Sequence, residues 1–452
     1  MTKTIFALAT PPGRSAIQII RVSGPGAARA LRRLAGFVPP PRQARMMLLK
    51  DKGGLPLDQA MVLFFKGPAS ATGEDLAEFH LHGSPVLGRM VMLELEEIPG
   101  LRLAEPGEFT RRAFLEGKIN LDQAEAIGDI IDADTSRQHY QAMAQLDGAL
   151  TKRTEEWRSR LISLSAHLEA IIDFADEDLP ESVVQDIRTG TSSLIDDLQS
   201  ALANAEAGII TRDGVTVALI GLPNAGKSTL LNALAGDERA IVSPEAGTTR
   251  DIIRVSLDIS GIPVHLVDTA GIRDTISIVE KEGVRRAIKA AASASIVLVL
   301  VDQTTSHPAS VFHEIRQNIM GKTEDEGLEM PKLIPVLTKS DLPTGAEPLP
   351  EWLMISASTG KGMAQLEKEL IGHIEDLTAT TEPPILTRQR HLEALQTALS
   401  ALKSASHLDM EHSPELMAEE FRHAAHALGR LTGRVDVEDL LDHVFSAFCI
   451  GK

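Results

Sequence analysis

The chain has 452 residues, 43% of them hydrophobic and 24% charged, a composition typical of a globular protein with two to four domains. Its net charge of −18 and its aromatic content of 3% weigh against a broad nucleic-acid surface, because such surfaces are basic and stack bases on aromatic rings. No segment has the roughly 18 uninterrupted apolar residues of a membrane span. The one cysteine, Cys449, excludes an internal disulfide, and we expect a cytoplasmic protein without a secretory signal.

The first part of the chain, residues 1–118, mixes short alternating apolar runs with Gly and Pro. The runs at 17–24 and 59–67 predict strands, so we expect a small α+β domain. Residues 119–211 and 373–452 space their apolar residues three or four apart, which predicts one discontinuous all-α domain.

Between these helical parts, residues 212–372 alternate apolar bursts with helical stretches. Buried parallel strands produce such bursts, so this segment predicts a doubly wound α/β domain that interrupts the helical one. The bursts lie at 215–220, 264–268, 294–302 and 332–341.

The strongest motif is GLPNAGKS at 221–228, which fits the phosphate-binding P-loop and stands between a predicted strand and a predicted helix. Such a loop directs backbone N–H groups at phosphates at the amino end of a helix. Lys227 would reach the β- and γ-phosphates, and the hydroxyl of Ser228 would bind Mg²⁺.

Three further motifs follow in the order that GTPases require. DTAG (268–271) ends a strand, which places Asp268 where a carboxylate orders the metal and Gly271 where an amide meets the γ-phosphate. TKSD (338–341) ends another strand, and Asp341 could accept hydrogen bonds from N1–H and the exocyclic amine of guanine, donors that adenine does not offer there. SAS (356–358) could contact the base oxygen. We predict a Ras-like P-loop domain that binds GTP.

GTTRD (247–251) lies between the P-loop and DTAG and supplies a switch threonine, Thr249, that would close onto Mg²⁺. Many small GTPases have Gln after the DTAG glycine, but this chain has Ile272, which can neither transfer a proton nor hydrogen-bond. Another group must therefore position the attacking water.

Taken together, these motifs and the terminal FCIGK (448–452) resemble the tRNA-modification GTPase MnmE (TrmE) family, of the TrmE-Era-EngA-like superfamily. The resemblance runs from end to end of the chain and includes TGED (72–75), PGEFTRRAF (106–114) and DQAEAI (122–127). It implies a K⁺-stimulated GTPase that is activated when two G domains meet, with Glu280 as the water-orienting acid. The potassium ligands would be Asn224 and Thr248 and the carbonyls of Ser243 and Glu245.

With that resemblance, the predicted nucleotide contacts come from five segments of the chain: Asn224, Ala225, Gly226, Lys227, Ser228 and Thr229; Ser243, Pro244, Glu245, Ala246, Gly247, Thr248 and Thr249; Asp268, Thr269, Ala270 and Gly271; Thr338, Lys339 and Asp341; and Ser356, Ala357 and Ser358. Thr338 stands where the common pattern has Asn. Because a hydroxyl replaces only part of an amide's tethering, we expect this change to affect nucleotide affinity rather than base identity.

The resemblance also implies a folate-binding N-terminal domain that helps to form a homodimer. Arg21, Glu78, Lys118 and Lys452 would contact 5-formyl- or 5,10-methylene-tetrahydrofolate, and Cys449 beside the terminal Lys452 is a possible functional thiol. The implied activity is modification of C5 of the wobble uridine of tRNA, adding a carboxymethylaminomethyl-type group. It would require an FAD-dependent partner of the MnmG (GidA) type in a heterotetramer, through which the acidic chain would meet its tRNA.

Two alternatives remain open at this point. The chain could be a ribosome-assembly switch whose GTP state controls docking, or a folate-dependent one-carbon transferase with a regulatory G domain. Loss of the wobble-uridine modification on gene deletion would favour the tRNA-modification enzyme over both alternatives.

Overall fold

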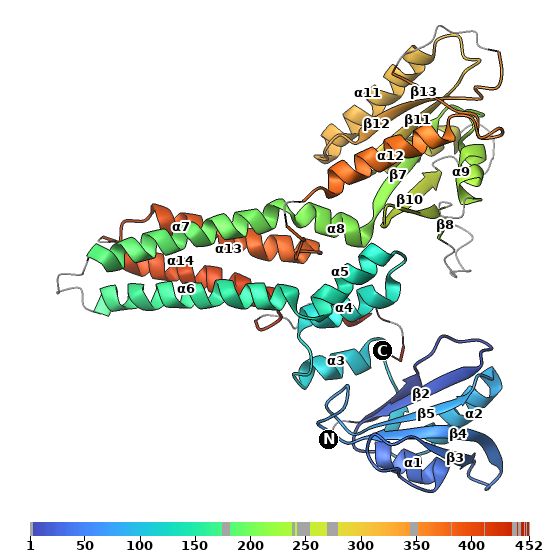
Figure 1. Cartoon of the computed structure of the whole chain (residues 1–452), viewed down its shortest axis with the longest axis vertical. Coiled ribbons are helices and arrows are strands. Elements are labelled where there is room, and N and C mark those ends of the chain that lie inside the picture. The colour runs from blue at the N-terminus through green and yellow to red at the C-terminus, as the bar shows by residue number, and fades with distance from the viewer. Residues whose placement is uncertain are drawn as a thin grey trace. The chain divides into compact units, whose positions relative to one another are not determined.

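A computed structural model of the chain describes residues 3–173, 181–236, 240–241, 254–268, 279–343, 351–380, 382–410, 412–435, 441, 444–446, 448 and 450–451. The chain forms two compact units, whose helices and strands are labelled in Figure 1. The first comprises Met1–Gly128, Gln145–Leu194 and Thr397–Lys452, and the second comprises Asp129–Ala144 and Ile195–Gln396. No helix among the described residues is long and apolar enough to cross a membrane.

A six-stranded sheet organises the amino-terminal part of the first unit. Its strands are β1 (Thr4–Leu8), β2 (Ile17–Ser23), β3 (Arg45–Lys50), β4 (Pro56–Phe65), β5 (Leu76–His82) and β6 (Leu101–Leu103). They lie in the order β3-β4-β5-β2-β1-β6. β1 and β6 pair in parallel, and the other neighbours pair antiparallel. β2 and β4 confirm the strands predicted at 17–24 and 59–67.

Alternation along these strands gives the sheet two different faces. Ile20 and Val22 of β2 and Phe79 of β5 point into a core that helices α1 (Ala27–Ala35) and α2 (Pro85–Glu96) cover. Arg21 lies between Ile20 and Val22, and Glu78 precedes Phe79, so these two residues point to the opposite face of the sheet. Helix α3 (Glu108–Leu115) packs Phe109 against Ile5 and Ala7 of β1.

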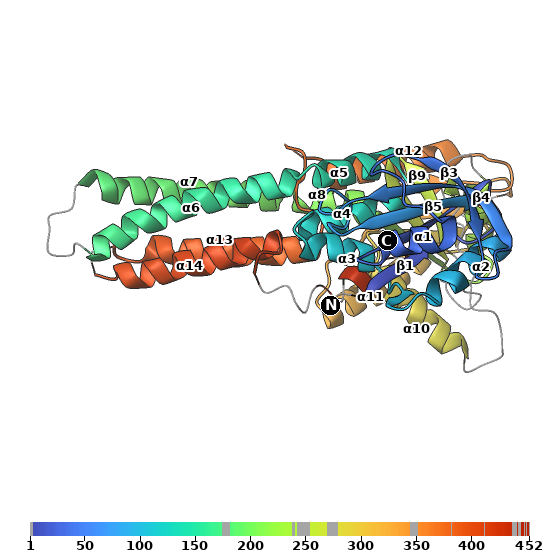
Figure 2. The ribbon, with the colours of Figure 1, turned by 90° about the horizontal axis from the view of Figure 1, so that it is seen from below.

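Long helices make up the rest of the first unit. These are α6 (Ala149–Asp173), α14 (Pro414–Leu431) and parts of α4 (Leu121–Asp132), α5 (Ser136–Leu146), α7 (Glu181–Ala203) and α13 (Gln389–His407). α6 packs along α14 (Figure 2). Its buried residues recur three or four apart, from Leu150 through Trp157 and Leu164 to Ile171, which is the spacing of one helix face. The predicted helical texture is confirmed.

The second unit is a doubly wound α/β fold, as predicted. Its sheet has the order β13-β12-β11-β7-β10-β9-β8, and the five strands from β13 to β10 run parallel. The strands are β7 (Val215–Gly221), β8 (Ala240–Ile241), β9 (Arg254–Ile259), β10 (Ile262–Asp268), β11 (Ile296–Asp302), β12 (Lys332–Thr338) and β13 (Leu353–Met354).

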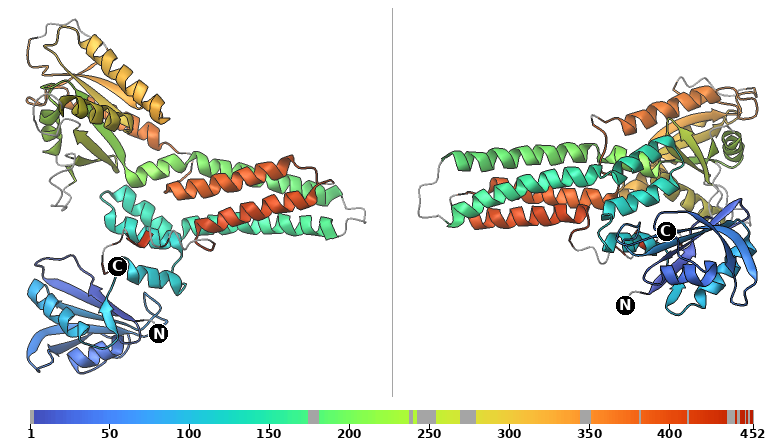
Figure 3. Two further views of the ribbon diagram at one scale, coloured as in Figure 1. Left: turned by 180° about the vertical axis from the view of Figure 1, so that it is seen from behind. Right: turned by 60° about the horizontal axis from the view of Figure 1, so that its bottom comes forward.

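Helices cover both faces of this sheet (Figure 3). One face packs against α9 (Lys227–Ala235), α12 (Met363–Thr378) and α8 (Ala205–Asp213), and the other against α10 (Val279–Ala292) and α11 (Pro308–Glu326). The antiparallel strands β8, at the edge of the sheet, and β9, between β8 and β10, were not predicted. β9 and β10 are joined by Ser260 (φ 55°) and Gly261 (φ 81°), a two-residue turn with positive φ at both positions.

Candidate nucleotide site

The P-loop follows the central strand β7 and leads directly into helix α9. Gly226 has φ +89° and accepts the N–H of Leu230 at 2.9 Å, so it ends the loop and starts the helix. A Cβ on Gly221 would lie 2.2 Å from the carbonyl oxygen of Leu300, so only glycine fits where β7 ends beside β11. These positions explain why the loop needs glycines where the motif has them.

Lys227 is buried within the loop and only 7% exposed. Its Nζ donates to the carbonyl oxygens of Gly221 (2.7 Å) and Leu222 (2.9 Å). Burial lowers the pKa of Lys227, and the negative charge of Asp268 opposes that shift. Two carbonyl oxygens of the loop therefore hold the ammonium, and an anionic ligand bound beside it would raise its pKa again.

Ser228 and Asp268 meet beside the loop. β10 pairs with β7, and this pairing brings Asp268, the last residue of β10, to 3.1 Å from the hydroxyl of Ser228. Asp268 is 2% exposed. Mg²⁺ takes oxygen ligands and is held in nucleotide sites by one or two protein groups together with phosphates. A hydroxyl and a buried carboxylate at this spacing fit that donor set.

A cavity of about 210 Å³ adjoins the other side of the P-loop. We call it the base cavity, because Asp341 and Ser356–Ser358, the residues predicted to contact the base, line it. Its lining comes from the P-loop helix, from the end of β12 and from the segment after β13: Gly226, Thr229, Leu230, Thr338, Lys339, Asp341, Leu342, Ile355, Ser356, Ala357 and Ser358.

The carboxylate of Asp341 is oriented by the segment after β13. A hydrogen bond from the hydroxyl of Ser356 is the main cause that lowers the pKa of Asp341. Ser356 is fully buried and also lies 3.0 Å from the hydroxyl of Ser358. Asp341 lines the cavity, and its lowered pKa keeps it an ionised acceptor, as guanine recognition would require.

Lys339 also lines the cavity. It has φ +58° and forms an ion pair with Asp302 at 2.5 Å. Burial alone would raise the pKa of Asp302, but the hydrogen bonds from Lys339 and Thr304 hold it below its ordinary value. This pair fixes the turn after β12 to the end of β11.

The structure brings together many of the predicted nucleotide contacts. All the predicted residues of the P-loop, of TKSD and of SAS line one edge of the sheet with Asp268. The rest of the prediction lies outside the described residues: Ser243, Pro244, Glu245, Ala246, Gly247, Thr248, Thr249, Thr269, Ala270 and Gly271. Glu280 is the second residue of α10, and its side chain is likewise outside them.

In the first unit, the predicted folate residues Arg21 and Glu78 face each other. Arg21 donates from Nε (3.1 Å) and Nη2 (3.0 Å) to Oε1 of Glu78, and Nε2 of His80 lies 3.1 Å from Oε2. The guanidinium also lies 5.9 Å over the ring of Phe109. Lys118 is exposed, and Lys452 and Cys449 lie outside the described residues.

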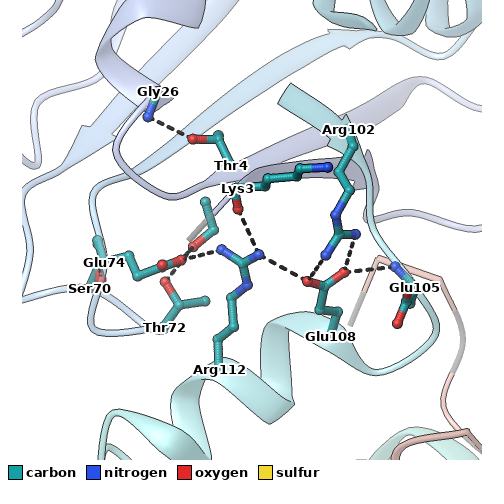
Figure 4. A network of polar contacts seen from close by, with 11 residues as sticks. Lys3, Thr4, Gly26, Ser70, Thr72, Glu74, Arg102, Glu105, Glu108 and Arg112 are labelled. Carbon is teal, nitrogen blue, oxygen red and sulfur yellow. Dashed lines mark hydrogen bonds and ion pairs between the residues drawn. The ribbon is translucent and has the colours of Figure 1, made fainter. Parts of the chain in front are cut away.

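A buried ion-pair network nearby was not predicted from the sequence (Figure 4). Arg112 of α3 donates to Glu74 (2.8 Å), to Glu108 (2.9 Å) and to the carbonyl of Lys3 (2.8 Å). Arg102 adds two bonds to Glu108, at 2.8 and 2.6 Å. Glu74 belongs to the TGED motif, and Glu108 and Arg112 belong to PGEFTRRAF. The spacing of four between Glu108 and Arg112 on one helix is the one signal of this network in the sequence.

In the second unit, the segment 129–144 contacts the β9–β10 turn. The hydroxyl of Thr135 donates to the carbonyl of Gly261 at 2.7 Å. Asp129 accepts from Arg212 (2.9 Å) and Arg388 (2.7 Å). The segment is therefore tied to the β9–β10 turn, to helix α8 through Arg212 and to the residue that precedes α13, Arg388.

Comparison with known proteins gives matches along the whole chain. A family model described as GTP-binding protein TrmE N-terminus matches residues 4–118, and one described as MnmE helical domain matches residues 121–449. The tRNA modification GTPase MnmE of Paramagnetospirillum magneticum is 46% identical over 457 residues, covering 100% of both chains. That of Granulibacter bethesdensis is 45% identical over 450 residues, covering 100% of this chain and 99% of its own.

Among solved structures, the G domain of the T. maritima FeoB iron transporter is 25% identical. The alignment covers 35% of this chain and 98% of that chain, with a TM-score of 0.25.

Proposed function

We propose the following function from the premise that the chain belongs to the tRNA modification GTPase MnmE family. It is a GTP hydrolase that acts in tRNA modification. The modification is the addition of a carboxymethylaminomethyl-type group at C5 of the wobble uridine of tRNA, carried out together with an FAD-dependent partner of the MnmG type. The hydrolysis requires Mg²⁺ and is stimulated by K⁺.

The observation that carries this proposal is the convergence of three groups on one sheet edge. Lys227 lies in the loop for the phosphates, Ser228 and Asp268 lie 3.1 Å apart beside it, and Asp341 lines the base cavity. The groups for the phosphates, for the metal and for the base would thus lie at one edge of the sheet, as the binding of a guanine nucleotide with Mg²⁺ requires.

The chain's own residues account for binding and orientation. Lys227 places a positive charge against the β- and γ-phosphates, and the N–H groups at the start of α9 add the field of a helix end. Ser228 and Asp268, with Thr249, would hold Mg²⁺, which when bound neutralises charge that develops on the phosphates. Asp341 accepts two hydrogen bonds from guanine.

The potassium site is a finer proposal. Asn224 lies in the loop with φ +63°, and its amide oxygen is a hard donor suited to K⁺; Thr248 and the carbonyls of Ser243 and Glu245 would complete the ligands. The cation would supply the positive charge that an arginine finger supplies elsewhere. Exchanging K⁺ for Na⁺ should slow turnover about tenfold or more while GTP binding changes little, and equal rates in both salts would remove this mechanism.

Glu280 is proposed to orient the attacking water. Glu280→Ala should therefore lower kcat far more than it weakens GTP binding, by about 10² or more if it is the main orienting group. Glu326→Ala, which removes an exposed carboxylate of α11 paired with Lys322 at 3.0 Å, is the matched control and should leave kcat unchanged. A Glu280→Ala protein with the wild-type kcat would exclude this role.

A folate derivative is the proposed ligand of the first unit. A carboxylate has about four acceptor positions, and Arg21 and His80 occupy three of those of Glu78. One position thus remains for an N–H of a pterin, while Lys118 and Lys452 suit the anionic glutamyl tail. Glu78→Gln should weaken binding of 5-formyl-tetrahydrofolate in a direct titration, and unchanged affinity would contradict the assignment.

The tRNA assignment includes a homodimer, a heterotetramer with the partner protein and a cytoplasmic location, where tRNA is modified. The acidic chain would meet its tRNA mainly through the partner. The test is mass spectrometry of tRNA nucleosides from a deletion strain. Loss of the C5 group, its return with the wild-type gene and its failure to return with Lys227→Ala would support the proposal. Intact wobble uridines in the deletion strain would favour the ribosome-assembly switch instead.

A further inference from the structure

Charge is unevenly distributed along this acidic chain. The first 50 residues contain nine Lys and Arg and no Asp or Glu, so all 63 acidic residues lie in residues 51–452. Seven of the nine cations are arginines. The chain is therefore acidic as a whole but begins with a basic segment, residues 1–50.

The basic segment forms β1, β2, α1 and β3 of the amino-terminal sheet. α1 covers one face of that sheet and contacts β3, the strand at its edge, and the two lie side by side in Figure 1. Two of the cations are used within the domain, because Arg21 pairs with Glu78 and Arg33 pairs with Glu94 of α2. Others stand on the surface.

Two exposed arginines lie on the outer side of α1. This helix turns Ala30, Leu31 and Leu34 to the core. Arg29 and Arg32 are three residues apart, so they share the opposite side of the helix, and both are exposed. Neither has an acidic partner among the described residues. Their guanidinium groups are therefore available to an anion from solution.

Three more cations follow the edge of the sheet, on β3 and just before it. Arg45 and Lys50 begin and end β3 and are exposed, and a strand of that length separates them by roughly 16 Å. Arg42 is exposed as well, and its guanidinium lies 5.8 Å over the ring of Phe65 and donates to the carbonyl of Ala69 at 2.7 Å. Among the described strands β3 pairs with β4 only, so its other side adds unpaired backbone N–H groups.

No carboxylate of the described part of the chain neutralises these edge cations. Arg45 donates to the neutral Oε1 of Gln43 at 3.2 Å, and no ion pair engages Arg42 or Lys50 there. A guanidinium binds phosphate through two parallel N–H bonds, which an ammonium cannot offer. Four arginines and a lysine spread over α1 and β3 therefore suit a ligand with several phosphates in a row, as in a nucleic-acid backbone.

We propose that the exposed cations of α1 and β3 form a surface that binds the phosphate backbone of RNA: Arg29, Arg32, Arg42, Arg45 and Lys50. This role rests on the proposed function in tRNA modification and gives the chain a direct contact with its RNA beside the contact through the partner. Backbone contacts position an RNA without reading its sequence. The acidic remainder of the chain repels phosphates, so it would confine the RNA to this surface.

The test is binding of a fluorescently labelled tRNA by the purified full chain without its partner, measured by anisotropy between about 50 and 200 mM salt. Each phosphate contact contributes about 0.7–0.9 to the slope of log K against log salt. The triple variant Arg29→Gln/Arg32→Gln/Arg45→Gln should therefore flatten the slope by about 2–3 and weaken binding about tenfold or more at the lower salt. Its GTP turnover and the Tm of the first unit should match the wild type, because all three side chains are exposed.

Two further triple variants separate a local surface from net charge. Arg316→Gln/Lys368→Gln/Lys403→Gln removes three cations from exposed positions on α11, α12 and α13 and should keep the wild-type slope. Arg29→Lys/Arg32→Lys/Arg45→Lys retains the charges and should keep most of the slope while losing the paired bonds of arginine. Equal flattening by the first of these two would show that only net charge matters and would overturn the assignment.

Three other results would also overturn it. These are a wild-type chain without salt-dependent tRNA binding, a Gln variant at positions 29, 32 and 45 with the wild-type slope, and a Gln variant that keeps tRNA binding but no longer elutes with the FAD-dependent partner in gel filtration. The last would assign the surface to a protein contact. None of them affects the wobble-uridine measurement in the deletion strain, so failure of this surface is distinguishable from failure of the proposed function.

Discussion

Removing the side chain of Arg112 should destabilise the first unit more than removing an exposed surface ion pair does. Its guanidinium makes three charged or polar contacts, with Glu74, Glu108 and the carbonyl of Lys3, and its side chain is only 8% exposed. Breaking a buried pair costs about 3–5 kcal/mol because the remaining charge is left without its partner. Here Glu108 keeps Arg102, and Glu74 keeps the hydroxyl of Ser23 at 2.8 Å.

The residual partners place Arg112→Ala near the lower end of that range, at about 3 kcal/mol. For a unit of this size, about 2–4 °C is lost per kcal/mol, so the transition of the first unit should fall by about 6–12 °C. Differential scanning calorimetry of the full chain measures it, and added GDP identifies the other transition, because a ligand raises the Tm of the unit that binds it.

The control is Lys52→Ala, which removes an ion pair whose side chains are 74% and 56% exposed. Such pairs contribute about 0–1 kcal/mol, so its transition should shift by no more than about 2–4 °C. If Arg112→Ala shifts Tm no more than Lys52→Ala does, the buried network does not hold this unit together.

The same network predicts a pH dependence. Burial opposes the ionisation of Glu108, but the bonds from Arg102, the N–H of Glu105 and Arg112 hold its pKa below the ordinary 4.5. Its contribution to stability is therefore complete above about pH 4.5 and is lost as the pH falls through the lower folded value. The difference in Tm between wild type and Arg112→Ala should shrink in that acidic range, and a difference that grows there would contradict the sign.

Three further substitutions test other contacts. Asp341→Asn should lower GTP affinity about tenfold or more and favour xanthosine triphosphate, whose 2-oxo group would accept from the new amide; equal loss of both nucleotides would contradict this. Ser228→Ala should abolish the gain in GTP affinity that Mg²⁺ gives over EDTA, and a full Mg²⁺ effect in the variant would remove Ser228 from the metal site. Thr135→Val should cost about 1 kcal/mol of stability and leave GTP affinity unchanged; no change in Tm would show that the bond to Gly261 contributes nothing.

The parts of the structure that the sequence predicted are those with a local signal. The apolar bursts gave the positions of β7, β10, β11 and β12, and the spacing of Trp157 and its neighbours gave helix α6. The order of the motifs was enough to expect Ser228 beside Asp268, because the carboxyl ends of neighbouring parallel strands meet at one edge.

The rest depends on pairing between distant residues. Strand β9 alternates the apolar residues Val255, Leu257 and Ile259 with polar ones, which is a local strand signal, but only its pairing with β10 places it in the sheet. Arg21 and Glu78 face each other because β2 and β5 pair in that register, and Glu74 lies 38 residues from Arg112. No periodicity in the sequence reports such contacts.

Thr338 shows both sides of this limit. The motif predicts that Thr338 replaces only part of an amide's tethering and so affects nucleotide affinity, and this stays a prediction; the sequence could not say which group the hydroxyl would bind. The answer depends on the closing of the P-loop against β12, which places the carbonyl of Ala225 at 2.8 Å.

The most direct test of guanine selection is a competition between GTP and ATP for the purified chain, measured by displacement of a fluorescent GDP analogue. Selection by Asp341 predicts that GTP binds tighter by roughly two orders of magnitude or more, since a site built to hydrogen-bond one ligand leaves its polar groups unpaired with the other. Equal affinities for the two nucleotides would contradict it.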